Sequence, residues 1–298
     1  MNPSIRLTSP SILNDNSFEY LVTALPQHEH IGGKQIIIDL SLIESIDAYG
    51  LLGLVIIGSY LRKNNCSTAI TLPRQKDALA FMYQAGFCSY LPGLFNEGSP
   101  VFSEPLPQES PFLLGITPID KSLDIHDIAI TVRESFRHRF PTETPDLWNN
   151  HIVIISEICQ NIPEHSKDSG FVAITCTHDT YKRPIMHIVI MDTGIGIRTS
   201  LNDRFQSVFR EKWSDHMALH KTLFEGVSRF NDPGRGNGIV RSKELVNKLN
   251  GKMSIRSGTA KLWGKIPSWE IERFFRKSLT YLPGTQINIQ LPVPIENS

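Results

Sequence analysis

Glu157 and Asn161 are the first residues whose types and spacing could do chemistry. They lie four apart, in a segment where Ile154, Ile155 and Ile158 follow helical spacing, so both side chains should share one helix face. A carboxylate there can orient or deprotonate a nucleophile, and an amide oxygen is a hard ligand that Mg²⁺ accepts beside phosphates and water. The same pair is common on ordinary helix surfaces, so its meaning depends on its neighbours.

A second candidate stands at the end of an apolar run, residues 188–191, which leads into Asp192-Thr193-Gly194-Ile195-Gly196. The run is typical of a buried strand, and glycine permits the tight turn that must follow. A carboxylate accepts hydrogen bonds and donates none, which suits an amine donor on a ligand. A tight strand-to-loop turn with a capping aspartate explains the residues equally well, and both interpretations stay open.

The third segment is Gly234-Arg235-Gly236-Asn237-Gly238, directly before a predicted helix. Glycines at alternate positions leave backbone N–H groups accessible, and a helix N-terminus favours phosphate. Arg235 could add a charge-assisted contact to the same anion. Taken alone, such a stretch is commonly only a flexible turn.

Composition restricts the class of protein that carries these segments. The chain has 298 residues, of which 40% are hydrophobic and 20% charged, enough for about two domains. Its net charge is zero, so we expect no nucleic-acid partner. It shows neither a targeting segment nor an apolar run near the roughly 18–20 residues that cross a bilayer, so we expect no membrane association. Four scattered cysteines indicate free thiols and a cytoplasmic location.

The first block, residues 1–95, is predicted to be an α/β domain. Its expected elements are strand 36–40, helix 50–63, strand 69–72 and helix 75–85. Residues 96–111 are predicted to be a linker, because prolines recur at positions 100, 105, 107 and 111.

The second block, residues 112–298, alternates helices and strands around a long insertion at 198–233. Its expected elements are helices 125–140, 145–165 and 239–250, and strands 170–177, 185–191, 252–257 and 286–291. Because the last strands can pair as neighbours, we expect a mixed sheet.

The three segments, taken in order, resemble the GHKL superfamily with its Bergerat fold, over about residues 112–295. That superfamily includes gyrase, the histidine kinases, MutL-type repair proteins and anti-sigma serine kinases. The resemblance implies an α/β sandwich that binds ATP with Mg²⁺ beneath a lid, here residues 198–233. It also implies that Gly284-Thr285 is the last short motif of the site.

The same resemblance implies a role for each candidate residue. Glu157 would be the catalytic base, Asn161 the Mg²⁺ ligand and Asp192 the acceptor for the adenine amine. The remaining cofactor-binding positions would be Gly194, Gly196, Gly234, Arg235, Gly236, Asn237, Gly238 and Thr285.

Some residues depart from this pattern or stay outside it. Pro163 follows Asn161 within the predicted helix and should kink or end it there. His165 is interpreted as a packing or helix-end residue in preference to a catalytic one. His216 and His220 lie four apart without a third ligand, which argues against a metal site between them.

The first block resembles a STAS domain, as found in anti-sigma factor antagonists. The resemblance rests on Ile36–Leu40 and on Ile46-Asp47-Ala48-Tyr49-Gly50-Leu51-Leu52-Gly53-Leu54. That family has a phosphorylatable serine directly before the helix glycine, and Tyr49 stands in that place here. We therefore expect this domain to pack or dock, with one face of helix 50–63 exposed to a partner.

The leading functional hypothesis is a Mg-ATP-dependent serine/threonine protein kinase of anti-sigma type, acting on a separate partner. That partner would be a STAS-domain or sigma-factor-like protein. Because no phosphoacceptor-histidine helix precedes the site, self-phosphorylation on histidine is disfavoured. The alternatives are a non-kinase ATPase or nucleotide-dependent conformational switch, and an interaction protein with a vestigial site. A homodimer stays open.

Overall fold

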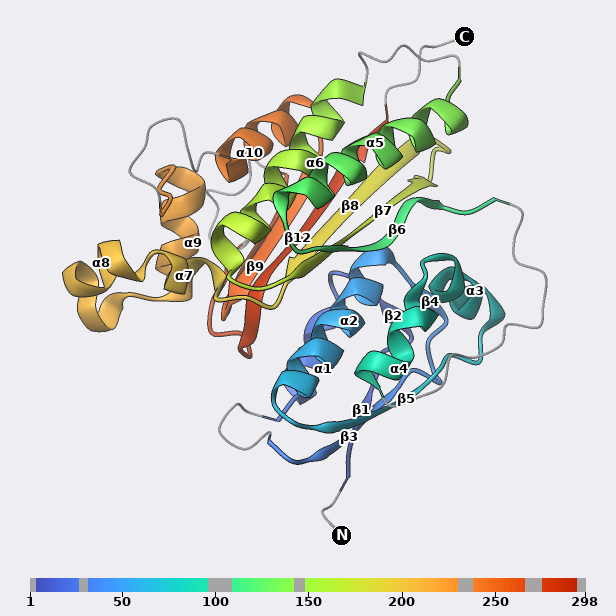
Figure 1. The fold of residues 1–298 in the computed structure, drawn as a ribbon, viewed down its shortest axis with the longest axis horizontal. Helices are drawn as coiled ribbons and strands as arrows, with labels where there is room; N and C mark the ends of the chain where they lie inside the picture. The colour runs from blue at the N-terminus through green and yellow to red at the C-terminus, as the bar shows by residue number, and fades with distance from the viewer. Residues whose placement is uncertain are drawn as a thin grey trace. The chain divides into compact units, whose positions relative to one another are not determined.

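A computed structural model of the chain describes residues 4–26, 32–95, 109–141, 148–229, 238–265 and 275–293 (Figure 1). The chain forms two compact units, Met1–Ile116 (unit 1) and Thr117–Ser298 (unit 2). The division falls within the strand Phe112–Ile119. Residues 96–108 of the predicted linker lie outside the described part of the chain. The α/β class expected from the sequence is confirmed.

Unit 1 is built on a parallel three-stranded sheet of order β1-β3-β5, accompanied by a parallel pair, β2 and β4. The strands are β1 (Ile5–Thr8), β2 (Ile12–Leu13), β3 (Gln35–Asp39), β4 (Ser45–Ile46) and β5 (Ser67–Thr71). The helices are α1 (Phe18–Ala24), α2 (Ala48–Lys63), α3 (Lys76–Gln84) and α4 (Leu91–Leu94). All four elements predicted for this block are confirmed, whereas β1, β2, β4, α1 and α4 were not predicted.

Helix α2 is buried along nearly its whole length, from Ala48 to Leu61 with the exception of Ser59. Asp47 caps it by accepting a hydrogen bond of 2.9 Å from the Gly50 backbone N–H. A Cβ added at Gly50 would overlap the Leu13 backbone, and one added at Gly53 would overlap the Phe18 ring. Glycine is therefore needed for this close packing. The expectation of an exposed docking face on this helix was wrong.

Unit 2 contains a seven-stranded sheet of order β11-β10-β9-β12-β8-β7-β6. The strands are β6 (Phe112–Ile119), β7 (Gly170–His178), β8 (Pro184–Asp192), β9 (Lys252–Gly258), β10 (Ala260–Gly264), β11 (Phe275–Arg276) and β12 (Leu282–Pro292). Each neighbouring pair from β7 to β11 is antiparallel. The four predicted strands are confirmed; β6, β10 and β11 were not predicted.

Three helices lie on one face of this sheet, α5 (Ser122–Arg139), α6 (Asn149–Asn161) and α10 (Gly238–Lys248) (Figure 1). The isoleucines of α6 at positions 154, 155 and 158 are buried. The α-helix ends at Asn161 and continues as a single π turn, Ile162–Ser166. Pro163 explains the change, because it lacks the N–H that an α-helical hydrogen bond requires. The predicted kink after Asn161 is confirmed.

The described part of the insertion folds as α7 (Gly196–Ser200), α8 (Asn202–Phe209) and α9 (Asp215–Phe224). In this segment the side chains of Phe205, Phe209 and Trp213 pack together, with ring centroids 5.3–6.0 Å apart. They do not share one helix, because α8 ends at Phe209.

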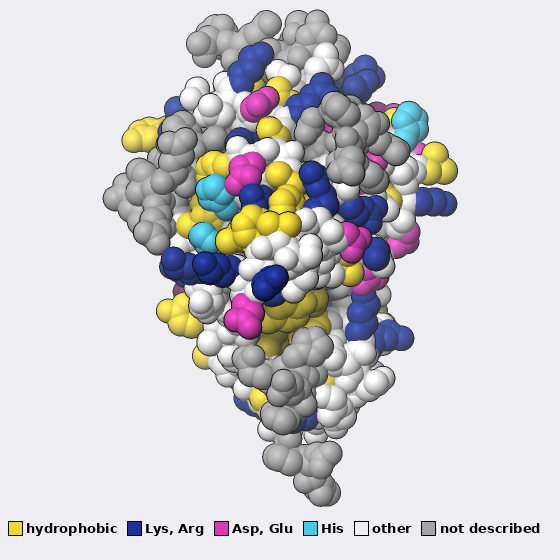
Figure 2. All heavy atoms as spheres, turned by 90° about the vertical axis from the view of Figure 1, so that its left-hand side faces the viewer, with side chains coloured by type: hydrophobic (Ala, Val, Ile, Leu, Met, Phe, Trp, Pro, Cys, Tyr) yellow, Lys and Arg dark blue, Asp and Glu magenta, His cyan; other side chains and the backbone are white. Residues whose placement is uncertain are grey.

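Basic and acidic side chains are interspersed over the face of the molecule that Figure 2 presents. Within the described ranges, no helix has the length and apolarity needed to span a bilayer.

Candidate functional site

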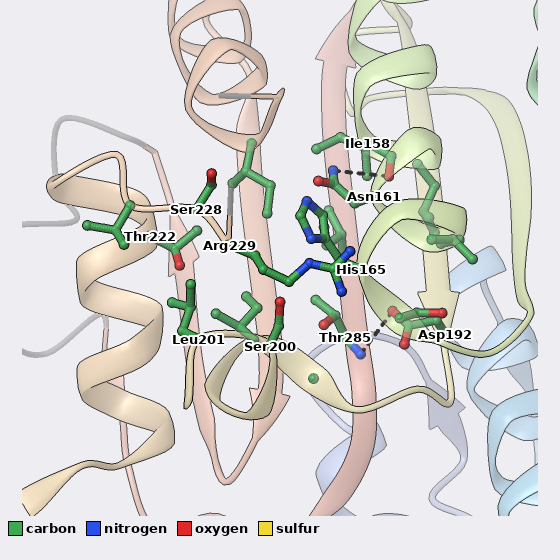
Figure 3. A pocket seen from close by; sticks show the side chains of 18 residues that line it. Ile158, Asn161, His165, Asp192, Ser200, Leu201, Thr222, Ser228, Arg229 and Thr285 are labelled. Atoms are coloured by element: carbon green, nitrogen blue, oxygen red, sulfur yellow. Dashed lines mark hydrogen bonds between the residues drawn. The ribbon is translucent and has the colours of Figure 1, made fainter. Parts of the chain in front are cut away.

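A pocket opens in unit 2 where α6, the π turn, the end of β8, α7, α9 and β12 come together (Figure 3). It encloses about 670 Å³, counted with the solvent at its mouth. Isoleucine side chains supply much of its apolar wall, at positions 158, 162, 190, 197, 239 and 287. Polar and charged side chains supply the rest, from Asn161, His165, Ser166, Asp192, Ser200, Thr222, Ser228, Arg229 and Thr285.

Asp192 is fixed at the end of β8, in the wall of this pocket, with 7% of its surface exposed. Its Oδ1 accepts a hydrogen bond of 2.8 Å from the Gly194 N–H, and its Oδ2 accepts one of 3.2 Å from the Thr285 N–H. Gly284, at φ +77°, allows the last strand to come this close, because a Cβ there would overlap the Asp192 carbonyl. As a carboxylate, Asp192 presents to the pocket a group that accepts hydrogen bonds and donates none.

The turn after Asp192 needs glycine for a steric reason. A Cβ on Gly194 would overlap the carbonyl of Ser166, which accepts a hydrogen bond of 2.9 Å from the Ile195 N–H. Gly196 has φ +70°, where a side chain would be strained, and α7 begins at this residue. Gly194 thus lets the turn pack against the π turn, and Gly196 supplies the backbone angle at which α7 begins.

Replacing Gly194 by alanine should therefore destabilise unit 2 by about 1–3 kcal/mol, since the new methyl group meets backbone that cannot move aside easily. Urea unfolding measures the effect. Gly93→Ala is the matched control, because a Cβ there would have only an ordinary contact, 3.6 Å from Arg62. Equal unfolding midpoints for Gly194→Ala and the unmodified chain would contradict this account of the turn.

Asn161 presents its amide oxygen to the pocket (Figure 3). The amide nitrogen donates to the carbonyls of Glu157, at 2.9 Å, and Ile158, at 3.3 Å. These two bonds turn the side chain so that its Oδ1 is directed away from the helix. Among the described residues, none donates a hydrogen bond to this oxygen. Asn161 therefore offers an oxygen that a hard cation can use.

Glu157 is not among the described residues that line the pocket. Its Oε1 forms an ion pair of 2.7 Å with Arg241 Nη1 on α10, and 29% of its side chain is exposed. Its Oε2 lies against the first residue of α10, Gly238, where a Cβ would be 3.0 Å away. Thus α6 directs Asn161 toward the pocket and Glu157 toward α10.

The structure therefore brings together four of the predicted residues, Asn161, Asp192, Gly196 and Thr285, on one pocket. Glu157, Gly194 and Gly238 are neighbours of these residues but do not line it. Residues Gly234, Arg235, Gly236 and Asn237 lie outside the described part of the chain.

Arg229 and His165 line the pocket, and neither was predicted as a site residue. Arg229 projects into the pocket from the segment after α9 and donates a hydrogen bond to the carbonyl of Glu164 (Figure 3). Burial, together with the neighbouring Arg229 charge, lowers the pKa of His165, against an opposing effect of Glu164. His165 is thus favoured in its neutral form. Arg229 lies near the C-terminal end of the insertion, residues 198–233, and no local pattern in the sequence marks it as a site residue.

The two histidines of the insertion, His216 and His220, each pack on an aromatic ring. His216 packs on the Phe275 ring at 4.2 Å between centroids, and His220 packs on Phe224 at 4.8 Å. Across the residues that the structure describes, no three histidine, cysteine or acidic side chains gather as a metal cluster.

Comparison with known proteins adds little to this geometry. No protein-family model matches the sequence, and no curated protein matches it significantly. Among solved structures, the chain has similarity to a mycobacterial sensor histidine kinase, MprB, at 18% identity and a TM-score of 0.27. The match covers 59% of this chain and 97% of that one.

Proposed function

We propose that unit 2 binds ATP with Mg²⁺ in the pocket of Figure 3, in the manner of a GHKL domain. The observation that carries the proposal is the convergence of Asn161, Asp192, Gly196 and Thr285, from four separate segments, on one largely apolar pocket. An apolar wall suits a planar base, and a buried carboxylate at its edge suits the exocyclic amine of adenine.

Other polar side chains of the pocket suit the rest of the nucleotide. The Asn161 oxygen suits Mg²⁺, which would neutralise phosphate charge when bound, and the Arg229 guanidinium suits a phosphate oxygen. Both groups line the same cavity as Asp192. The chain thus supplies an acceptor for the base, a metal ligand and a cation for the phosphates within one cavity.

The leading form of the proposal is a protein serine/threonine kinase of anti-sigma type, with a STAS-like or sigma-factor-like protein as its separate substrate. In this form Glu157 accepts the proton of the attacking hydroxyl group. One observation favours the second form, a nucleotide-dependent switch with slow turnover: Glu157 is paired with Arg241 beside the pocket.

Two measurements test the proposal in sequence. Calorimetry with ATP, with and without Mg²⁺, should show binding that the metal strengthens; absence of binding in both conditions would refute the proposal. Incubation with γ-labelled ATP and co-purified proteins then separates its forms. Label transferred to a protein indicates a kinase, label released only as phosphate indicates an ATPase, and retained ATP indicates a binding switch.

We further propose that unit 1, which resembles a STAS domain, acts by docking and is not itself a phosphoacceptor at Tyr49. The Tyr49 side chain is buried, with 1% of the residue exposed. Its ring packs edge-on against Phe18, with centroids 5.5 Å apart. A hydroxyl in this position cannot be aligned with a nucleotide without opening the domain.

We therefore expect no phosphate on Tyr49 after incubation of the chain with Mg-ATP. Intact-mass spectrometry should give the same mass before and after incubation, for both the unmodified chain and Tyr49→Phe. Stoichiometric addition of phosphate that disappears in Tyr49→Phe would show that Tyr49 is an acceptor and would overturn the docking proposal.

A further inference from the structure

Arg241 is the residue that sets where the Glu157 carboxylate lies. Its Nη1 is 2.7 Å from Glu157 Oε1, between two helices that are far apart in sequence and packed together in the fold. The other carboxylate oxygen rests beside Gly238, the first residue of α10. Both oxygens of Glu157 are therefore directed toward α10, and the side chain does not line the pocket.

This position conflicts with the action of a base. A general base must come within hydrogen-bond reach, about 2.6–3.2 Å, of the proton that it removes, directly or through one water. Asn161, one turn further along α6, does line the pocket, so only a change of side-chain direction separates Glu157 from it. The ion pair with Arg241 opposes that change.

The pair is weak enough to open. The Arg241 side chain is 61% exposed and that of Glu157 is 29% exposed. Ion pairs in such surroundings shift an equilibrium by about twofold to fivefold, because water competes for both charges. The restraint is therefore graded, and the carboxylate remains able to leave α10.

We propose that Arg241 is a positioning residue that holds Glu157 out of the pocket and thereby slows nucleotide turnover. The inference rests on the proposed function, because it requires Mg-ATP in the pocket and Glu157 as the base. It adds a built-in restraint on the same site, located on the helix that follows the glycine-rich stretch.

The test is Arg241→Gln in the full chain, with steady-state turnover measured over a range of Mg-ATP concentrations. We expect kcat to rise about twofold to fivefold and KM to change by less than about twofold, because the pair restrains the base without contacting the nucleotide. Arg241→Lys, which keeps the charge, should stay near the unmodified rate. Lys248→Gln removes an exposed charge from the same helix and is the matched control.

A second variant separates a restraint on Glu157 from any other effect of Arg241. In the Glu157→Gln background, Arg241→Gln should leave the residual rate unchanged. A kcat for Arg241→Gln equal to or below that of the unmodified chain, or an equal gain in both backgrounds, would overturn the inference. Calorimetry on the unmodified chain distinguishes failure of the proposed function from failure of this inference. Absence of Mg-ATP binding refutes the proposed function, whereas binding together with an unaltered kcat in Arg241→Gln refutes only the role of Arg241.

Discussion

Replacing Asp192 by asparagine is expected to weaken ATP binding about ten- to a hundredfold. The loss of a hydrogen bond to a charged group costs about 1.5–3 kcal/mol, which corresponds to that range of affinity. Asparagine offers an NH₂ group where the carboxylate has a second acceptor oxygen. Calorimetric titration with Mg-ATP measures the change directly.

The contacts of Asp192 indicate that Asp192→Asn should also destabilise the folded chain. Both carboxylate oxygens of Asp192 accept from backbone N–H groups, those of Gly194 and Thr285. In either orientation an asparagine NH₂ group would therefore face one donor. We expect the free energy of unfolding to fall by about 1–3 kcal/mol, so affinity must be measured where the variant is fully folded.

Asp179→Asn is the matched control for Asp192→Asn. The Oδ1 of Asp179 also accepts from two backbone N–H groups, those of Tyr181 and Arg183, but it lies at the opposite end of the β7–β8 hairpin. Its ATP affinity should stay within about twofold of the unmodified chain. Unchanged affinity in a folded Asp192→Asn variant would remove Asp192 from the adenine site.

Replacing Glu157 by alanine is expected to retain ATP binding and to reduce turnover about 10²- to 10⁴-fold. A general base acts in the transition state, so its loss affects the rate far more than ground-state affinity. The substitution also leaves the fold intact, because the ion pair with Arg241 is partly exposed and contributes at most about 1 kcal/mol.

Glu244→Ala tests whether this loss is specific to the position. Glu244 is an exposed carboxylate on α10, so its removal changes the net charge equally without touching Asn161 or the pocket. Single-turnover rates with γ-labelled ATP compare the two variants. Normal turnover by Glu157→Ala would mean that another group removes the proton.

Much of the secondary structure could be predicted from the sequence, because strong periodicities are local. The apolar runs before Leu40 and Asp192 became β3 and β8, and the helical spacing around Ile155 became α6. The end of that α-helix was also predictable, since Pro163 removes a backbone donor wherever it occurs. Strand β6 was missed, because Gly115 and Pro118 within it are typical of loops.

The convergence of the site could be predicted only in part. The resemblance of the sequence to a known superfamily implied Asn161, Asp192 and Thr285 as site residues, and the fold places all three on one pocket. It gave no sign that Arg229 would project into that pocket or that His165 would line it. Neither residue belongs to a local repeat, so no periodicity marks it.

Three contacts that shape the site were decided by tertiary structure alone. The Ser166 carbonyl leaves no room for a side chain at Gly194. The Thr285 N–H donates a hydrogen bond to Asp192, and Arg241, 84 residues from Glu157 in the sequence, forms an ion pair with it. A local pattern determines which face of a helix or strand is apolar, because that face depends only on the spacing of apolar residues and on the number of residues per turn of the helix or per repeat of the strand. Which atom meets which across elements depends on how the helices and the sheet pack, and the packing of α6 against α10 is what directs Glu157 to Arg241.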